Sequence, residues 1–215
     1  MTKKERAAKI VEALKIEYTV PECTLDYADA WQLLVSVRLA AQCTDARVNV
    51  VTQDLFEKYP SAQALADAEV SDIEAMVRTC GLGASKARDI SAAMKLLVSQ
   101  YGGIVPDTLD ELLKFPGVGR KSANLVVGDV YGKPAIVCDT HCIRLCHRFG
   151  LTDTDKPALC ERQLREIIDP KEGNDFCHRL VLHGRAVCTA RSPRCGECCL
   201  RELCKSAKEI DSASI

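Results

Sequence analysis

Hydrophobic residues recur at helical spacing along almost the whole chain. Near the N-terminus, Ala7, Ile10, Val11 and Leu14 fall on one face of a helix expected over residues 4–17. The same spacing predicts long helices over 29–41, 45–59, 85–101, 120–131, 140–149, 157–168 and 174–186, and short ones after residue 60, over 71–80 and over 108–115. No segment alternates polar and apolar residues as a strand does. The pattern therefore predicts an all-α fold.

Polar residues predict where several of these helices begin. Short polar side chains favour the N-cap position because they accept hydrogen bonds from the first free amides of a helix. Such caps are expected at Ser71 with Glu74, Thr108 with Glu111, Ser85, Asp139, and Asn174 or Asp175.

Composition indicates a globular protein of the cytoplasm. The 215 residues are 47% hydrophobic and 27% charged, which excludes a disordered chain. The N-terminus enters an amphipathic helix directly, and Arg38 interrupts the most apolar stretch, so we expect neither a signal peptide nor a membrane span.

The charge is distributed unevenly, although the formal net charge is only −1. Residues 114–148 contain six Lys or Arg against two Asp or Glu, and residues 178–205 contain the same numbers. Two such segments are able to line one groove for a polyanion. Solvated helix faces are the alternative interpretation.

A glycine hairpin lies between two predicted helices at residues 116–120. Pro116 ends the first helix, Gly117 and Gly119 flank Val118 and are expected to adopt backbone angles closed to other residues, and Arg120 opens the next helix. Free amides that lead into a helix N-terminus form a seat for a phosphate without contact to any base. An ordinary tight turn is the alternative.

Two residues near this hairpin have side chains suited to catalysis. Lys121 lies beside Arg120 at the positive end of a helix dipole, which favours a nucleophilic amine, although an exposed lysine is more often only solvated. Asp139 is expected to cap the next helix, whose amides stabilise its charged form.

Four of the thirteen cysteines form a cluster near the C-terminus. The spacing C-x6-C-x2-C-x5-C joins Cys188, Cys195, Cys198 and Cys204, and four thiolates so close together favour zinc or an iron–sulfur cluster. The spacing does not decide between the two metals. Scattered cysteines, for instance Cys160, are interpreted as small core residues.

Several segments together resemble the endonuclease III family of helix-hairpin-helix DNA glycosylases of the iron–sulfur type. They are FPGVGRKSAN, VCDTH and LHGRAVCTARSPRCGECCLRELC, with LAAQCTDARVN and GLGASKARDI before them. The resemblance runs in order from the N-terminal helix to about residue 210. It implies a 4Fe–4S cluster on the four cysteines in place of zinc. It also implies a six-helix domain over 21–133 and an iron–sulfur cluster domain made of 1–20 and 134–215, which flank a DNA-binding cleft.

The resemblance further implies a bifunctional DNA glycosylase and abasic-site lyase of base excision repair. Such an enzyme removes oxidised pyrimidines from duplex DNA through a Schiff base on Lys121 and nicks the strand 3′ to the abasic site by β-elimination. Asp139 is then the catalytic carboxylate. The implied partner is double-stranded DNA with damaged bases or abasic sites, bound by a monomer at a bacterial or archaeal nucleoid, with no membrane partner.

The remaining site residues are likewise carried over from the resemblance. Gln42 and Leu82 match residues that fill the gap left by a flipped nucleotide, although on their own they read as a helix-terminal glutamine and a buried leucine. His141 matches a position near the reacting sugar. The DNA backbone is expected to meet Gly117, Val118, Gly119, Arg120, Arg191 and Arg194.

Two other functions remain as alternatives. A mismatch- or adenine-specific glycosylase is disfavoured by Lys121, because the adenine branch resembles this family but lacks a lysine at that place. A non-catalytic iron–sulfur protein would use the hairpin only as a clamp for DNA phosphates.

Overall fold

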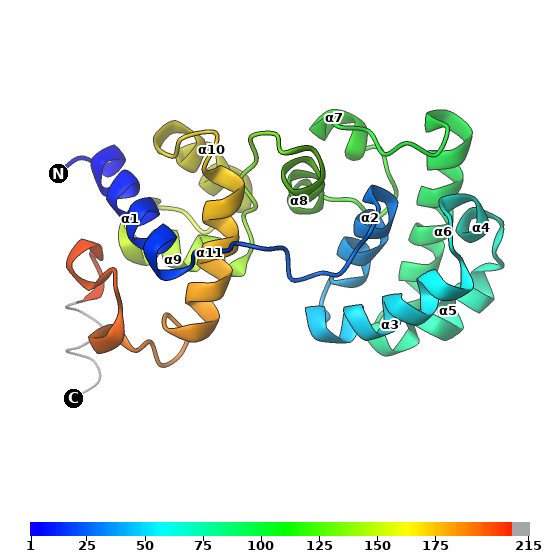
Figure 1. The fold of residues 1–215 in the computed structure, drawn as a ribbon, viewed down its shortest axis with the longest axis horizontal. Helices are drawn as coiled ribbons and strands as arrows, with labels where there is room; N and C mark the ends of the chain where they lie inside the picture. Colours follow the sequence, from blue (N-terminus) through cyan, green and yellow to red (C-terminus); the bar gives the residue numbers. More distant parts are fainter. Residues whose placement is uncertain (208–215) are drawn as a thin grey trace. The chain divides into compact units, whose positions relative to one another are not determined.

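The computed structural model describes residues 1–207, and this range is helical without a strand, which confirms the predicted all-α fold. The chain divides into two compact units (Figure 1). Residues 23–132 form one unit, and residues 1–22 with those from 133 onward form the other. None of the described helices combines the length and apolar character needed to cross a bilayer.

The unit of residues 23–132 is built around one long central helix. That helix, α6 (Gly83–Tyr101), packs against α2, α4 and α5 and buries Ile90, Met94 and Leu97 on one face. The other elements are α2 (Ala30–Leu39), α3 (Asp45–Lys58), α4 (Ala62–Asp67), α5 (Val70–Val77), the 3-10 turn η1 (Arg78–Cys80), α7 (Leu109–Leu112) and α8 (Arg120–Tyr131). Helix α8 packs against α2 and α7, which places the glycine hairpin beside α2.

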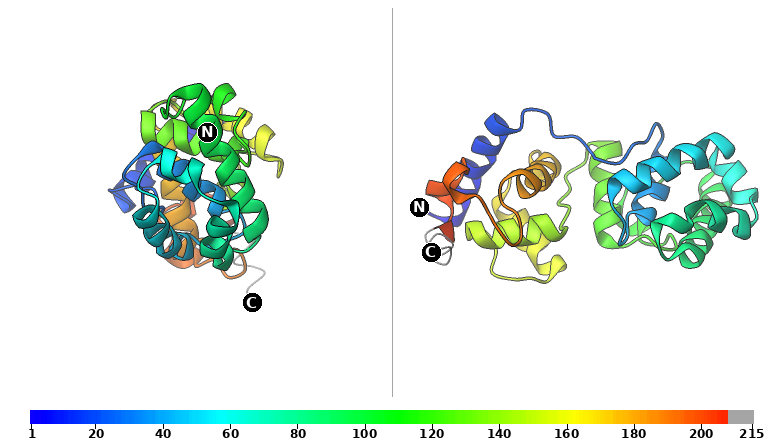
Figure 2. Two further views of the ribbon diagram at one scale, coloured as in Figure 1. Left: turned by 90° about the vertical axis from the view of Figure 1, so that its right-hand side faces the viewer. Right: turned by 90° about the horizontal axis from the view of Figure 1, so that it is seen from below.

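The other unit joins the N-terminal helix to the C-terminal part of the chain. It contains α1 (Lys3–Glu17), α9 (Thr140–Phe149), α10 (Pro157–Ile167), α11 (Gly173–Ala186) and the 3-10 turns η2 (Cys195–Glu197) and η3 (Arg201–Leu203). Helix α1 contacts α10, α11 and η3, and α9 packs against α11 (Figure 2). A hydrogen bond of 3.0 Å between the Tyr18 hydroxyl and His183 Nδ1 ties the end of α1 to α11.

Three predicted helix starts are wrong by one to three residues. Helix α5 begins at Val70, so Ser71 lies inside it. Helix α6 begins at Gly83 rather than Ser85, directly after the left-handed backbone of Leu82. Helix α11 begins at Gly173, ahead of both predicted caps. In none of these helices does the N-cap side chain bond an amide, so the packing of the helix sets its start.

The predicted capping box of α7 forms only by half. The Thr108 hydroxyl accepts the amide of Glu111, as expected. The Glu111 carboxylate turns away and instead accepts hydrogen bonds of 2.6 Å from the Tyr101 hydroxyl and the Lys114 ammonium. A phenol and an ammonium together outcompete one exposed backbone amide.

Gly173→Ala should lower the free energy of unfolding by about 2 kcal/mol, because overpacking forces backbone to move. A Cβ at position 173 would lie 2.5 Å from the Ala135 carbonyl oxygen and 2.9 Å from Ile136 Cδ1. Helix propensity alone predicts that alanine at this position raises the free energy of unfolding. Chemical denaturation measures the free energy of unfolding of each variant. Gly196→Ala is the control, because a Cβ at position 196 would meet nothing within 4 Å. Equal effects of the two substitutions would contradict this packing.

Candidate functional site

The glycine hairpin between α7 and α8 depends on Gly117. Its φ of +75° lies in the left-handed region, and a Cβ there would lie 2.5 Å from Arg38 Cδ. Gly119 differs: its φ of −95° and ψ of 174° are extended, and a Cβ would meet nothing within 4 Å. The expectation that Gly119 needs special backbone angles is therefore wrong. Only one of the two glycines is required by the turn itself.

The hairpin leads into the positive end of α8. Gly119 is the N-cap and has no side chain, so the first-turn amides of α8 receive no cap from it. Arg120 and Lys121 follow and are exposed. Val118 faces the other way, since its side chain is buried and its amide donates to the Phe115 carbonyl at 3.1 Å. An anion is therefore best received by the start of α8 rather than by Val118.

An ion pair beneath the hairpin was not predicted. Arg38 of α2 donates from Nη2 and Nε to Asp89 Oδ2 of α6, at 2.6 and 2.8 Å, and both side chains are largely buried. The Arg38 side chain fills the space that Gly117 leaves open. In the sequence, Arg38 is visible only as an interruption of an apolar stretch. Its partner lies on a helix 51 residues later, which spacing alone does not reveal.

Gln42 and Leu82 share an unusual backbone conformation. Among the described residues, they are the only two other than glycine with a positive φ, at 57° and 54°. Leu82 is 58% exposed, so the interpretation of this leucine as a core residue is wrong. Strained backbone that holds a polar and an apolar side chain outward is typical of residues with a binding role.

Lys86 fastens the two segments that carry these residues. Its side chain is fully buried, and Nζ donates to the carbonyls of Leu39 and Cys80, each at 2.8 Å. Leu39 ends α2 just before Gln42, and Cys80 precedes Leu82 by two residues. Burial lowers the pKa of Lys86, so the two carbonyls are what stabilise the ammonium there. Nothing in the sequence distinguished this lysine from a surface lysine.

In the other unit, Asp139 caps α9 as predicted. Its Oδ1 accepts the Cys142 amide at 2.7 Å, and the residue is partly exposed. The cap holds the carboxylate in one orientation at the N-terminus of α9. His141 lies in the first turn of α9, where Arg144 Nη2 is 3.2 Å from its Nδ1.

The four C-terminal cysteines line one small cavity, together with Phe149, Val187 and Pro193. Cys198 lies in this lining and Cys199 is exposed, so the geometry favours Cys198 of the adjacent pair. A single zinc ion would draw four sulfurs to about 3.8 Å from one another, given Zn–S bonds of about 2.3 Å. Among the described residues, no three of these four sulfurs lie within 4.8 Å of one another. The wide lining therefore suits a polynuclear cluster better than one zinc ion.

Hydrogen bonds hold this cysteine loop to α9 and α11. Arg148 Nη1 donates to Cys188 Sγ at 3.3 Å and to the Thr189 carbonyl at 2.8 Å. The Leu200 amide donates to Cys198 Sγ, and His183 Nε2 lies 3.4 Å from the same sulfur. Burial lowers the pKa of His183 to about 4, so its ring is neutral near pH 7. N–H groups aimed at sulfur are the outer contacts that tune such clusters.

Not all cations of the two basic segments are available to a polyanion. Arg144 donates to the Cys188 carbonyl at 3.0 Å, and Arg148 donates to the loop after it, so both support the fold. Arg194 bonds the Ala186 carbonyl and lies 3.5 Å from Glu197. Arg191 is exposed. The number of charges in a segment does not separate these arginines, because the sequence does not show which of them donate hydrogen bonds to backbone carbonyls.

Two family models match the chain. One, described as HhH-GPD superfamily base excision DNA repair protein, matches residues 35–170, and the other, the iron-sulfur binding domain of endonuclease III, matches residues 188–204. Endonuclease III of Synechocystis sp. is 44% identical over 208 residues, which are 96% of this chain and 95% of that protein. Endonuclease III of Escherichia coli (strain K12) is 34% identical over 97% of this chain and 99% of its own length.

A solved structure gives the same result for the whole fold. A non-covalent Endonuclease III–DNA complex matches with a TM-score of 0.93 and 38% identity, and the match covers 99% of this chain and 100% of that chain. The agreement extends through both units and includes all of the helices that carry the residues described above.

Lys86→Met should lower the free energy of unfolding by about 2 kcal/mol, because two buried carbonyls lose their donor. Amide hydrogen exchange should accelerate at residues 40–43 and 80–83, where the two segments are no longer tied together. Lys95→Met is the matched control, since Lys95 is an exposed lysine of the same helix. Unchanged exchange in both segments would show that Lys86 does not hold them.

Proposed function

Because this chain belongs to the endonuclease III family of base excision DNA repair proteins, we propose that Lys121 and Asp139 carry out its chemistry. The chain is a DNA glycosylase with lyase activity at abasic sites, and it binds DNA. The observation that supports the choice of nucleophile is the position of Lys121. Its exposed amine lies in the first turn of α8, directly after a hairpin suited to hold a phosphate.

Lys121 acts as the nucleophile on the sugar. Its neutral amine attacks C1′ of the deoxyribose, the glycosidic C–N bond breaks, and the base leaves after it takes up a proton. The nitrogen lone pair then opens the sugar ring to an imine. Loss of a C2′ proton expels the 3′ phosphate by β-elimination and nicks the strand. A relative has been solved as a trapped endonuclease III–DNA covalent intermediate, which supports a covalent step of this kind.

Asp139 acts as a charged carboxylate near the reacting sugar. Its Oδ1 accepts the Cys142 amide at 2.7 Å, which fixes the orientation of the side chain. A fixed negative charge stabilises the positive charge that develops on the deoxyribose as the base leaves. The same carboxylate accepts and returns protons as the imine forms and the strand is nicked.

The substrates are oxidised pyrimidines in duplex DNA. Excision from a duplex requires that the damaged nucleotide leave the stack, which costs a few kcal/mol unless other groups fill the gap. Gln42 and Leu82 are suited to this role, because their strained backbone projects an amide and an exposed apolar side chain from two segments tied by Lys86. His141 contacts the DNA near the reacting sugar.

The chain carries a 4Fe–4S cluster, to which we assign a structural role in DNA binding. We assign its ligands to Cys188, Cys195, Cys198 and Cys204, which line one cavity. When bound, the cluster cross-links residues 188–204 and so shapes a loop that presents Arg191, and to a lesser degree Arg194, to backbone phosphates. The enzyme acts as a monomer at the bacterial or archaeal nucleoid.

Lys121→Ala should abolish covalent trapping on abasic-site DNA in the presence of borohydride, and should reduce strand nicking by about a thousandfold or more, because the amine that forms the imine is gone. Gel electrophoresis of the trapped complex measures the result. Lys114→Ala is the matched control, since it removes an exposed cation from the same basic segment. Trapping that persists in Lys121→Ala would assign the nucleophile to another amine.

Asp139→Asn should reduce base excision by about a hundredfold or more while stability changes little, because asparagine keeps the cap but not the charge. Asp139→Ala should in addition lower the free energy of unfolding by about 1 kcal/mol, because alanine cannot cap α9. Single-turnover excision and thermal unfolding, measured on both variants with intact cluster absorbance, separate the two roles. Normal excision by a well-folded Asp139→Asn would leave this carboxylate as a cap alone.

A further inference from the structure

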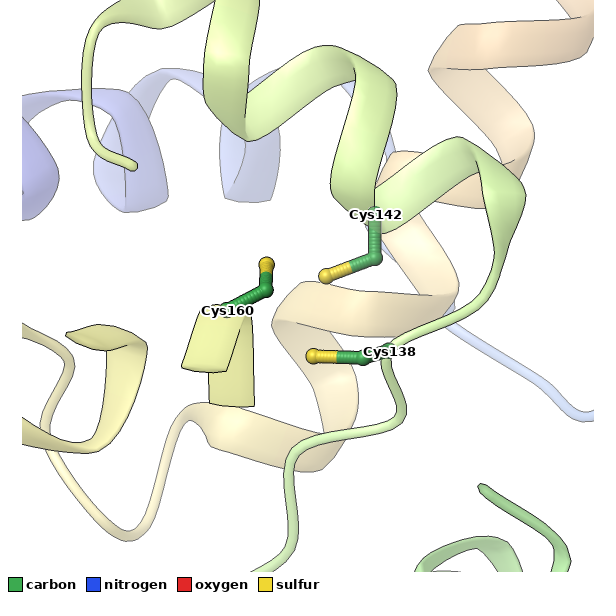
Figure 3. A group of neighbouring side chains, drawn as sticks. All are labelled: Cys138, Cys142 and Cys160. Atoms are coloured by element: carbon green, nitrogen blue, oxygen red, sulfur yellow. The ribbon is translucent and has the colours of Figure 1, made fainter. Parts of the chain in front are cut away.

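Three buried thiols meet in the unit that carries Asp139, away from the cysteines of the cluster loop. The sulfurs of Cys138, Cys142 and Cys160 all lie within 4.8 Å of one another (Figure 3). Their residues are 7%, 0% and 0% exposed. Cys160 is a buried core residue, as expected, and the fold brings its sulfur to those of Cys138 and Cys142. Figure 3 shows the sulfurs of the three side chains as close neighbours.

The spacing of these sulfurs is close to that of a mononuclear thiolate site. Zn–S bonds of about 2.3 Å in a tetrahedron place sulfurs about 3.8 Å apart. The three thiols therefore need to move by no more than about an ångström to share one such ion. The family model for the iron–sulfur domain begins at Cys188 and ends at Cys204, so it does not include them.

Neighbouring sulfurs act on these thiols in opposite directions, because they raise the pKa of Cys142, first through the Cys138 thiol, and lower the pKa of Cys160. Cys177 Sγ accepts the Val137 amide at 3.2 Å, and the Cys177 thiol also interacts with that of Cys142. The thiols of Cys138 and Cys142 lower the pKa of Cys160, and the buried hydroxyl of Thr152 contributes to the same shift. A buried thiolate needs a nearby positive charge, and a metal ion supplies it.

We propose that Cys138, Cys142 and Cys160 bind a Zn²⁺ ion at a site separate from the iron–sulfur cluster. Each S–Zn bond forms as the thiol releases its proton to water, and no group is oxidised or reduced. Soft thiolates select zinc over magnesium or calcium. Because the site is closed to solvent, the ion enters as the chain folds.

The site would fix the backbone on both sides of Asp139. Cys138 precedes Asp139 directly, and the Cys142 amide donates the hydrogen bond that caps α9. A metal that joins these two cysteines would hold the carboxylate in place. This consequence for catalysis rests on the function proposed for Asp139, whereas the metal site itself does not.

Elemental analysis of the holoprotein tests the site. Protein made in zinc-supplemented medium and dialysed without oxygen against metal-free buffer should contain one zinc per chain beside the iron of the cluster. Cys160→Ala and Cys142→Ala should each lower zinc at least tenfold and leave the iron content and the cluster absorbance unchanged. Cys80→Ala and Cys199→Ala, which alter a buried and an exposed cysteine elsewhere, should keep the zinc.

Several outcomes would overturn the proposal. Holoprotein with full iron and no zinc would refute it, as would zinc that survives in both Cys160→Ala and Cys142→Ala. Zinc that disappears only in Cys199→Ala would be bound at the surface. If Cys160→Ala and Cys142→Ala both lose iron as well, unsubstituted protein made in cobalt-supplemented medium provides the test. Co²⁺ bound by thiolates shows intense sulfur-to-metal charge-transfer absorption, and the absence of this absorption would refute the site.

Discussion

One hydrogen bond, from the Cys142 amide to Asp139 Oδ1, orders much of the C-terminal unit. It starts α9, and α9 in turn carries Arg144 and Arg148 toward the loop that begins at Cys188. Those two guanidinium groups bond carbonyls of that loop and the Cys188 sulfur, so the cap, the helix and the cluster loop form one connected structure. The carboxylate at its origin is the one to which catalysis is assigned.

A buried ammonium has a corresponding role in the other unit. Lys86 holds the end of α2 to the end of η1 and so sets the two strained positions, Gln42 and Leu82. The Arg38–Asp89 ion pair supports the neighbouring hairpin in a similar way. Lys86 and the Arg38–Asp89 pair thus each support a segment to which we assign a role in DNA binding, and apolar packing supplies most of the remaining stability of the unit.

The sequence pattern predicted well those features that depend on residues close together in the chain. The helices, the Asp139 cap and the C-terminal cysteine set all follow from spacing over a few residues. The roles of Lys86, Arg38, Arg144 and Arg148 did not, because their partners lie 40 or more residues away or are backbone carbonyls, which every residue has. The thiol cluster was missed for the same reason, since Cys160 is brought to Cys138 and Cys142 only by the packing of α10. The starts of α5, α6 and α11 were misplaced because their N-cap side chains make no hydrogen bond to the helix.

The central claim is that the amine of Lys121 forms the covalent bond to DNA. Mass-spectrometric peptide mapping of the borohydride-reduced complex with abasic-site DNA tests it most directly. The reduced sugar should be attached to the peptide that contains Lys121, at Nζ. A sugar attached to another lysine or to the N-terminal amine would contradict it.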